Sequence, residues 1–383
     1  MMSSLVPNAI GVANAPCQRN PRDLSSYDYA LDSRLIAQKP TFPKSAAKLL
    51  VYDRERDKIT HTTFARLWDF VPPKCLIVLN DTQVIRARIY GAKPSGAKIE
   101  LLYHSKCDEC GRFLVQIRGK VRVGDWVIFS GGVVAKVVEL CEDGLRIVEF
   151  YESLRGGDLG DLQNLDSRDL DSSDFKKMDF PVLMAFLEIH GHIPLPPYIK
   201  RADSESDSQD YQSVFAKNIG SIAAPTASLH FSQNDMKIIA KRPHCFISLH
   251  IGAGTFFGVE THDITAHKMH KESFFVSRDS ANAIMNANEI LCVGTTATRC
   301  VEYLAKNLQN FGRDFGGECD IFINPLNPPI KTSHILTNFH LPKSTLIMLV
   351  AGFIGIEKTL EIYQIAQDLE YKFYSYGDGM LIL

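Results

Sequence analysis

The sequence predicts an α/β protein: a mixed-sheet α/β domain with an inserted small antiparallel β-barrel domain. Two observations support this fold class. Helix-like and strand-like segments alternate from residue 180 to the C-terminus, whereas residues 88–151 contain only short β-rich segments between Gly-containing turns. The 383 residues are 45% hydrophobic and 22% charged, an ordinary globular composition that is sufficient for two or three domains.

The first elements belong to the α/β domain. Residues 1–22 are polar and aperiodic, so we expect a disordered extension there. Asp32 is placed to cap a short helix ending at Ile36. Residues 48–52 and 58–61 alternate as a hairpin, and residues 64–70 form a short helix. Residues 75–79 are continuously apolar, which is typical of a strand buried on both faces.

The barrel is predicted at residues 83–151, and its strand segments are residues 98–103, 113–117, 126–129, 133–140 and 145–150. Residues 152–179 are rich in Asp, Gly and Ser, which predicts an acidic flexible loop without calcium-loop spacing. The α/β domain is therefore discontinuous and comprises residues 23–82 and 180–383.

The second half of this domain is predicted to contain three buried strands, at residues 246–251, 290–293 and 335–339. Residues 297–308 are typical of a helix that places Val301, Leu304 and Leu308 on one face. The longest apolar run, residues 345–356, is too short to cross a bilayer. We therefore expect a buried strand or a core helix there, and no membrane partner.

Charge and cysteine content restrict the class of partner and compartment. The formal net charge is −2, so RNA binding requires a local basic patch. Arg118, Lys120 and Arg122 form the one compact basic cluster, and a solvated hairpin tip is the alternative interpretation. Nine scattered cysteines and the absence of a secretory signal pattern predict a reducing, cytoplasmic location.

Polar blocks at predicted strand ends indicate a site assembled from loops. Residues 336–346 hold Thr, Asn, His, Lys and Ser together, and residues 224–231 and 249–256 are similar. His230, His250 and His340 lie inside these blocks, and each is a candidate acid/base group or a hydrogen-bonded structural histidine. A zinc site made of the three histidines is conceivable, but no Glu or Cys is suitably spaced beside them.

Two glycine-containing turns are candidates for ligand contact. Thr295, Thr296 and Arg299 follow Gly294 where a strand joins a helix, and amides there suit a carboxylate or phosphate, although simple helix capping is the alternative. Gly252 and Gly254, with Thr255, follow another strand. Their spacing misses the dinucleotide fingerprint but permits close approach of a ligand.

Two further motifs have equally plain alternatives. Cys107 and Cys110 form a lone Cys-x-x-Cys, and Cys141 alone does not supply the second pair of a zinc knuckle. Residues 374–380 form an aromatic, Gly-containing turn that can stack on a base or serve as a hydrogen-bonded terminal turn.

Taken together, the ordered blocks resemble the S-adenosylmethionine:tRNA ribosyltransferase-isomerase family of queuosine biosynthesis. The resemblance extends from Asp23 to the C-terminus. The matching segments are residues 80–82, 84–85, 87–88, 96–100, 192–199, 211–216, 224–231, 249–256, 267–272, 294–299, 337–346 and 374–380.

The resemblance implies transfer and isomerisation of the ribosyl moiety of S-adenosylmethionine onto 7-aminomethyl-7-deazaguanine at the tRNA wobble position. The products would be epoxyqueuosine-tRNA, adenine and methionine. It also implies a barrel inserted in an α/β domain, a substrate tRNA with a GUN anticodon and no metal, and we expect a monomer.

The resemblance suggests roles for the candidate residues. His230, His250 or His340 is the acid/base group, and replacing His250 with Asn is expected to abolish turnover without unfolding the protein. The expected S-adenosylmethionine contacts are Gly252, Gly254, Thr255, Thr295, Thr296, Arg299 and Asn338, and the expected RNA contacts are Arg88, Lys98, Arg118, Lys120 and Arg122.

Three positions depart from the family pattern. Gln83 replaces a basic residue, Arg86 replaces Pro, and Ser228 replaces a Gly, which would strain Ser228 if that Gly had a positive φ. Two other functions compete with the one that the family implies. A methyltransferase would need its Gly-rich loop after the first strand, and a noncatalytic RNA-binding protein would leave the His/Thr/Asn blocks unexplained.

Overall fold

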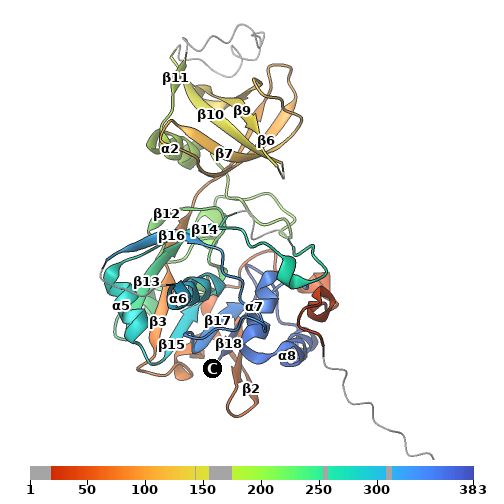
Figure 1. The fold of residues 1–383 in the computed structure, drawn as a ribbon, viewed down its shortest axis with the longest axis vertical. Coiled ribbons are helices and arrows are strands. Elements are labelled where there is room, and N and C mark those ends of the chain that lie inside the picture. Colours follow the sequence, from red (N-terminus) through yellow and green to blue (C-terminus); the bar gives the residue numbers. More distant parts are fainter. Residues whose placement is uncertain (1–18, 143, 155–174, 253–257, 308–312) are drawn as a thin grey trace, which may run out of the picture.

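The computed structural model describes residues 19–142, 144–154, 175–252, 258–307 and 313–383. Figure 1 shows two parts, a β-barrel at the top and a larger α/β body below it. The body is built on a nine-stranded mixed sheet, and the barrel is antiparallel. The predicted fold class is therefore confirmed.

Six strands close the barrel: β5 (Arg88–Ala92), β6 (Lys98–Lys106), β7 (Arg112–Arg118), β8 (Trp126–Phe129), β9 (Val133–Leu140) and β10 (Leu145–Ser153). β10 pairs with both β7 and β9, and β5 pairs with both β6 and β8, so the ring has no gap. Inward residues such as Leu101, Val115 and Phe150 form its core. The predicted segments match five of these strands, and β5 is the additional one.

Both ends of the predicted acidic loop are strand in the structure. β10 extends to Ser153, and β11 (Phe175–Lys177) pairs with it. Residues 155–174 lie outside the described residues. Helix α2 (Phe180–His190) follows, and Leu183, Phe186 and Leu187 pack into the barrel core. The exact domain boundaries stay a prediction, but this helix shares its hydrophobic core with the barrel.

The large sheet has the strand order β16-β14-β13-β3-β15-β17-β18-β1-β2. Its strands are β1 (Lys48–Asp53), β2 (Lys58–Thr63), β3 (Leu76–Asn80), β13 (His244–Leu249), β14 (Glu272–Val276), β15 (Ile290–Val293), β16 (Phe315–Cys319), β17 (His334–Asn338) and β18 (Gly379–Ile382). Strands β13, β3, β15 and β17 are parallel neighbours, so their C-terminal ends lie along one edge. β3 is buried throughout, as predicted.

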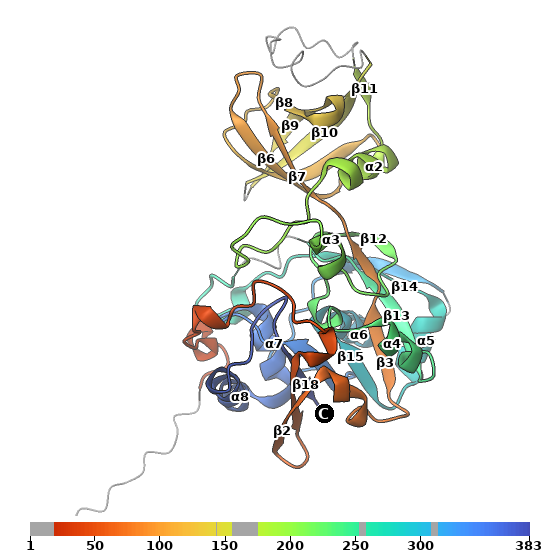
Figure 2. The same ribbon diagram turned by 180° about the vertical axis from the view of Figure 1, so that it is seen from behind.

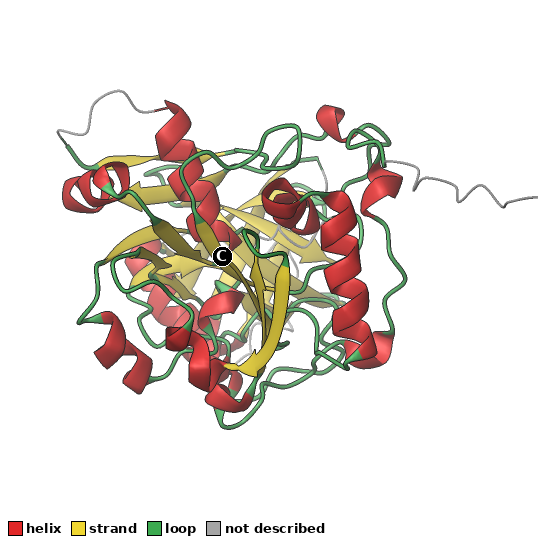
Figure 3. Cartoon of the chain, turned by 90° about the horizontal axis from the view of Figure 1, so that it is seen from below, coloured by secondary structure: helices red, strands yellow, loops and turns green. Residues whose placement is uncertain are grey.

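Helices cover both faces of this sheet, as Figures 2 and 3 show. One core joins Val78, Cys292 and Ile335 of the sheet to α5 (Arg278–Asn286), α6 (Thr295–Asn307), α7 (Thr345–Ile354) and α8 (Ile356–Asp368). The alternate residues Ile77 and Leu291 face a second core with α4 (Gln233–Ile239) and the 3-10 helix Phe64–Asp69. A short two-stranded sheet, β4 (Thr82–Val84) with β12 (Asn218–Ser221), lies beside these layers.

Several local predictions are confirmed. Asp32 accepts a hydrogen bond from the Arg34 amide at the start of a 3-10 helix, Ser33–Leu35. The longest apolar run forms the core helix α7, and Gly355 ends it with φ 79°. Val301 and Leu304 of α6 are buried, while Leu308 lies outside the described residues. Among the helices that the structure describes, none is long and apolar enough to cross a membrane.

Candidate functional site

A cavity of about 120 Å³ opens at the C-terminal ends of β15 and β17. Ligands of open α/β sheets commonly bind at this edge. The cavity is lined by residues 223–227, 294–296, 337–338, 340–342 and 374–375, and by Tyr198, Tyr211, Ile251, Gly258, Ser344 and Leu346. Two of the polar blocks predicted from sequence, residues 224–231 and 336–346, therefore meet the Gly294 turn around one cavity, whereas the described residues of the block at 249–256 contribute only Ile251. The predicted residues that line the cavity are Thr295, Thr296, Asn338 and His340.

The turn from β15 into α6 brings Thr295 and Thr296 to this cavity. Gly294 has φ 92°, a conformation that a residue with a side chain rarely adopts, and its amide donates to the Leu336 carbonyl. The Asn80 side-chain amide donates to the Thr296 hydroxyl at 3.1 Å. The helix N-terminus therefore faces the cavity, an arrangement that favours hydrogen-bond acceptors.

Asn338, the last residue of β17, connects the polar blocks. Its Oδ1 accepts from the Thr226 hydroxyl at 2.8 Å, and its Nδ2 donates to the Gly377 carbonyl at 3.3 Å. Nδ2 also lies 3.5 Å from Nε2 of His230. His230 stacks on Phe64 with ring centroids 4.0 Å apart, and it lies behind Asn338 without lining the cavity. Burial lowers the pKa of His230 to about 4.

His340 is the predicted histidine that lines the cavity. Its Nε2 lies 2.8 Å from the Thr337 hydroxyl, and its backbone amide donates to the Tyr363 hydroxyl. Within the described part of the chain, no residue hydrogen-bonds to its Nδ1. Burial lowers the pKa of His340 to about 3, so the imidazole is neutral at pH 7.

His250 lies elsewhere. Its Nδ1 is 2.7 Å from the Thr82 hydroxyl of β4, and its ring packs on Gly220, where an added Cβ would lie 2.9 Å from the imidazole. Burial also lowers its pKa. Gly252 has open space around its Cα, whereas Gly254 and Thr255 lie outside the described residues. The structure therefore does not bring His250 to the cavity that His340 lines.

Arg299 is also separated from Thr295 and Thr296. Its guanidinium forms a buried ion pair with Glu272 of β14 and donates to the Cys319 carbonyl. It lines a smaller neighbouring cavity together with His267 and His270, and Leu346 borders both cavities. Because its charge is already neutralised by Glu272, Arg299 is poorly placed to bind a carboxylate in the larger cavity.

The predicted RNA contacts lie on the barrel, and none lines the cavity. Arg88 is half-buried and pairs with Glu100 at 3.2 Å, and Arg118 approaches the same carboxylate at 3.5 Å. The other three predicted RNA contacts are exposed residues: Lys98, Lys120 and Arg122.

The three departures from the family pattern have simple structural settings. Ser228 lies in a 3-10 helix with no positive φ, so the anticipated strain is absent. Arg86 approaches Glu188 of α2 at 3.8 Å. Gln83 is the central residue of β4, where it pairs with β12.

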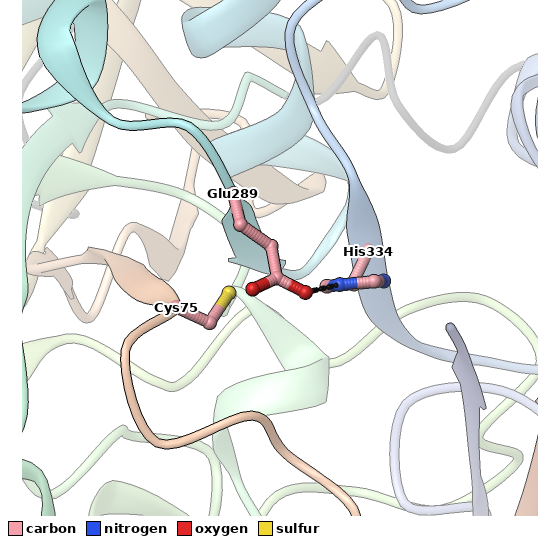
Figure 4. A group of neighbouring side chains, drawn as sticks. All are labelled: Cys75, Glu289 and His334. Atoms are coloured by element: carbon pink, nitrogen blue, oxygen red, sulfur yellow. Dashed lines mark hydrogen bonds and ion pairs between the residues drawn. The ribbon is translucent and has the colours of Figure 1, made fainter.

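A different cluster lies at the opposite edge of the sheet, where β3, β15 and β17 begin. Figure 4 shows Cys75, Glu289 and His334, whose potential ligand atoms all lie within 4.8 Å of one another. Among the described residues, this is the one such group of His, Cys, Asp and Glu that could hold a metal ion. Nε2 of His334 hydrogen-bonds Glu289 at 2.6 Å, and burial raises the pKa of Cys75 to about 12. A protonated thiol is a poor ligand, and the expected absence of a metal stays a prediction.

The buried neutral histidines predict a loss of stability in mild acid. The pKa values of His230 and His340 are about 4 and about 3 in the folded state, below the ordinary 6.5. The unfolded state therefore binds more protons than the folded state below pH 6.5. The contribution of the two histidines to the free energy of unfolding is complete above pH 6.5 and is lost as the pH falls toward 3. Urea unfolding at pH 5 rather than 7.5 should show a loss of about 2 kcal/mol for each histidine. His230→Asn should reduce that pH dependence, and an unchanged dependence would contradict the assignment.

The fold is a mixed-sheet α/β domain that carries an inserted β-barrel and has a cavity at its strand ends. Comparison with known proteins identifies the family of the chain. The chain belongs to the family described as "Queuosine biosynthesis protein", whose model matches residues 24–382. The S-adenosylmethionine:tRNA ribosyltransferase-isomerase of a Nitratiruptor species is 50% identical over 365 residues, which cover 95% of this chain and 99% of that protein. The enzyme of the same name from Helicobacter pylori (strain Shi470) is 48% identical and covers 94% of this chain and 99% of its own.

A crystal structure of S-adenosylmethionine tRNA ribosyltransferase from Thermotoga maritima is also similar. It shares 28% identity and a TM-score of 0.49, covering 94% of this chain and all of that one. The predicted family and enzyme class are confirmed by the curated relatives.

Proposed function

We propose that this enzyme transfers and isomerises the ribosyl moiety of S-adenosylmethionine onto 7-aminomethyl-7-deazaguanine at the wobble position of tRNA. The products are epoxyqueuosine-tRNA, adenine and methionine. The proposal is supported by close identity over nearly the full chain to enzymes named for this kind of transfer. A cytoplasmic location, a monomeric state and GUN-anticodon tRNA as substrate remain predictions.

The observation that carries the proposal is the meeting of residues 223–227, the turn at residues 294–296 and residues 337–342 around one cavity. Thr295 and Thr296 lie at the N-terminus of α6. Hydrogen bonds with the Thr226 hydroxyl and the Gly377 carbonyl hold the Asn338 side-chain amide in place. Among the described residues that line the cavity, His340 is the histidine, so we assign it the proton transfer that removal of a ribosyl proton requires. His230 supports Asn338 from behind, and we assign it a positioning role.

The exposed basic residues of the barrel are proposed as tRNA phosphate contacts. Replacing Lys120 with Ala should weaken tRNA binding and reduce the slope of log K against log salt by about 1. Lys58, an exposed lysine on the β1–β2 hairpin of the α/β body, supplies the matched control. Electrophoretic mobility shifts at several salt concentrations measure both slopes, and equal slopes for the two variants would exclude Lys120 from the interface.

Adenine release tests the proposed reaction directly. The purified protein is incubated with S-adenosylmethionine and tRNA that carries 7-aminomethyl-7-deazaguanine, and adenine is measured by chromatography. The expected result is adenine formation that depends on the modified base. Formation of S-adenosylhomocysteine would instead indicate a methyltransferase, and tight tRNA binding without adenine release would indicate a noncatalytic binding protein.

A further inference from the structure

The cavity lining carries no formal charge. Among the described residues that line it, none is Asp, Glu, Lys or Arg, and its one histidine, His340, is neutral at pH 7. A desolvated charge is costly in such surroundings, whereas a flat neutral heterocycle with hydrogen-bonding edges is well accommodated. Adenine is the neutral aromatic part of S-adenosylmethionine, and the ribose is neutral but not aromatic. The sulfonium, amino and carboxylate groups, and the aminomethyl group of the deazaguanine, all carry charge.

Tyr198 and Tyr374 form an aromatic wall of this cavity. Their ring centroids are 4.5 Å apart and their planes differ by 21°. The Tyr198 hydroxyl is fixed by a 2.7 Å hydrogen bond with the Ser375 hydroxyl. The hydrogen bond fixes the Tyr198 ring, and Tyr374 stacks on it, so the aromatic surface is present without a ligand.

Tyr374 has two unusual properties. Its φ is 70°, a left-handed conformation that is an outlier for an aromatic residue. Tyr374 is only 5% exposed. Its hydroxyl is buried and has no hydrogen-bond partner among the described residues. Burial raises the pKa of Tyr374, so the phenol stays protonated and retains a proton to donate. Tyr374 lines the cavity, and a buried donor without a partner calls for an explanation, which an acceptor atom of a bound ligand would supply.

The surrounding turn maintains this strained conformation. The Asp378 carboxylate accepts from the Lys48 and Lys372 backbone amides, each at 2.7 Å. A Cβ at Gly377 would lie 2.5 Å from the Lys372 carbonyl oxygen, so a larger residue would displace the turn. The Tyr374 amide donates to the Phe339 carbonyl. Strain that is held in place by so many neighbours is characteristic of ligand-binding sites.

We propose that this cavity is the adenine subsite, in which Tyr198 and Tyr374 supply the aromatic wall and the Tyr374 hydroxyl donates a hydrogen bond to a ring nitrogen of adenine. The proposal rests on the proposed function and extends it by naming the residues that select the purine. The charged Arg299–Glu272 pair lies in the neighbouring cavity across Leu346, outside the adenine subsite.

A protein–ligand double-mutant cycle tests this assignment. Equilibrium dialysis measures binding of adenosine and of 1-deaza-, 3-deaza- and 7-deazaadenosine to the full chain and to Tyr374→Phe. The wild type should bind one deaza analogue about tenfold more weakly than adenosine, because one acceptor nitrogen is missing. Tyr374→Phe should bind adenosine about tenfold more weakly and no longer discriminate against that analogue.

The control is Tyr371→Phe. Tyr371 is equally buried, but its hydroxyl hydrogen-bonds His61 away from the cavity, so this variant should keep both the affinity and the discrimination. Circular dichroism confirms that each variant is folded. Failure of the wild type to bind adenosine at millimolar concentration would overturn the subsite, as would discrimination that persists in Tyr374→Phe. The adenine-release assay tests the proposed reaction independently of the subsite. If the wild type discriminates among the adenosine analogues but releases no adenine, the proposed reaction is refuted and the adenine subsite is still supported.

Discussion

Replacing His340 with Asn is expected to lower kcat for adenine release by about 10²- to 10⁴-fold, the range for loss of an acid/base group. His340 is the predicted histidine at the cavity, and its Nδ1 has no hydrogen bond from the described residues. The Michaelis constant for S-adenosylmethionine should change much less than kcat, because Asn preserves the polarity and part of the volume. Its pKa of about 3 also means that His340 itself adds no inflection near pH 6.5 to kcat/KM of the free enzyme.

The His250→Asn variant distinguishes between His340 and His250 as the acid/base group. If His250 were the acid/base group, as the sequence alone allows, its variant would show the larger loss of kcat. The structure places its ring against Thr82 and Gly220, so we expect the smaller effect there. His61→Asn, which removes a hydrogen bond to Tyr371 far from the cavity, controls for general effects of histidine replacement.

Glu272→Ala is expected to lower the free energy of unfolding by about 3–5 kcal/mol, because it leaves the Arg299 guanidinium charged and buried without its partner. The two side chains are 3% and 8% exposed, so the pair is largely shielded from bulk solvent. Urea denaturation measures the loss. Replacing both residues with apolar ones of similar size, Glu272→Leu with Arg299→Met, should recover most of it, since no unpaired charge then remains.

An exposed ion pair in the same region supplies the control. Lys271 and Glu318 lie 2.9 Å apart, and each side chain is 61% exposed. Glu318→Ala should therefore cost less than about 1 kcal/mol. Equal losses for the Glu272 and Glu318 variants would show that burial of the Arg299 pair is not what makes it important.

Periodicity and local composition were sufficient to predict most of the fold. Apolar runs at residues 75–79, 290–293 and 335–339 correctly indicated buried strands, because burial on both faces leaves few polar residues, and the structure shows that these strands pair in parallel. The same logic placed the polar blocks at strand ends. Since parallel strands end at one edge, Asn338 and His340 meet Thr295 and Thr296 there.

Side-chain direction and distant partners could not be predicted in this way. Arg299 follows Thr296 by less than one helical turn, yet Glu272, far away in sequence, holds it in a different cavity. His250 lies in one of the predicted polar blocks, but its ring contacts Thr82 of β4 and Gly220 of β12 instead of the cavity. The positive φ of Tyr374 depends on tertiary contacts of its turn, and no residue type in the sequence marks it.

The strand order has a consequence for how the chain assembles. β18 follows every other strand in the sequence, but it lies between β17 and β1 in the sheet. The early hairpin of β1 and β2 therefore joins the rest of the sheet through a strand made more than 300 residues later. Such long-range closure slows folding and leaves strand edges exposed in the meantime. During synthesis, the first hairpin therefore cannot pair with β18 until residues 379–382 have been translated.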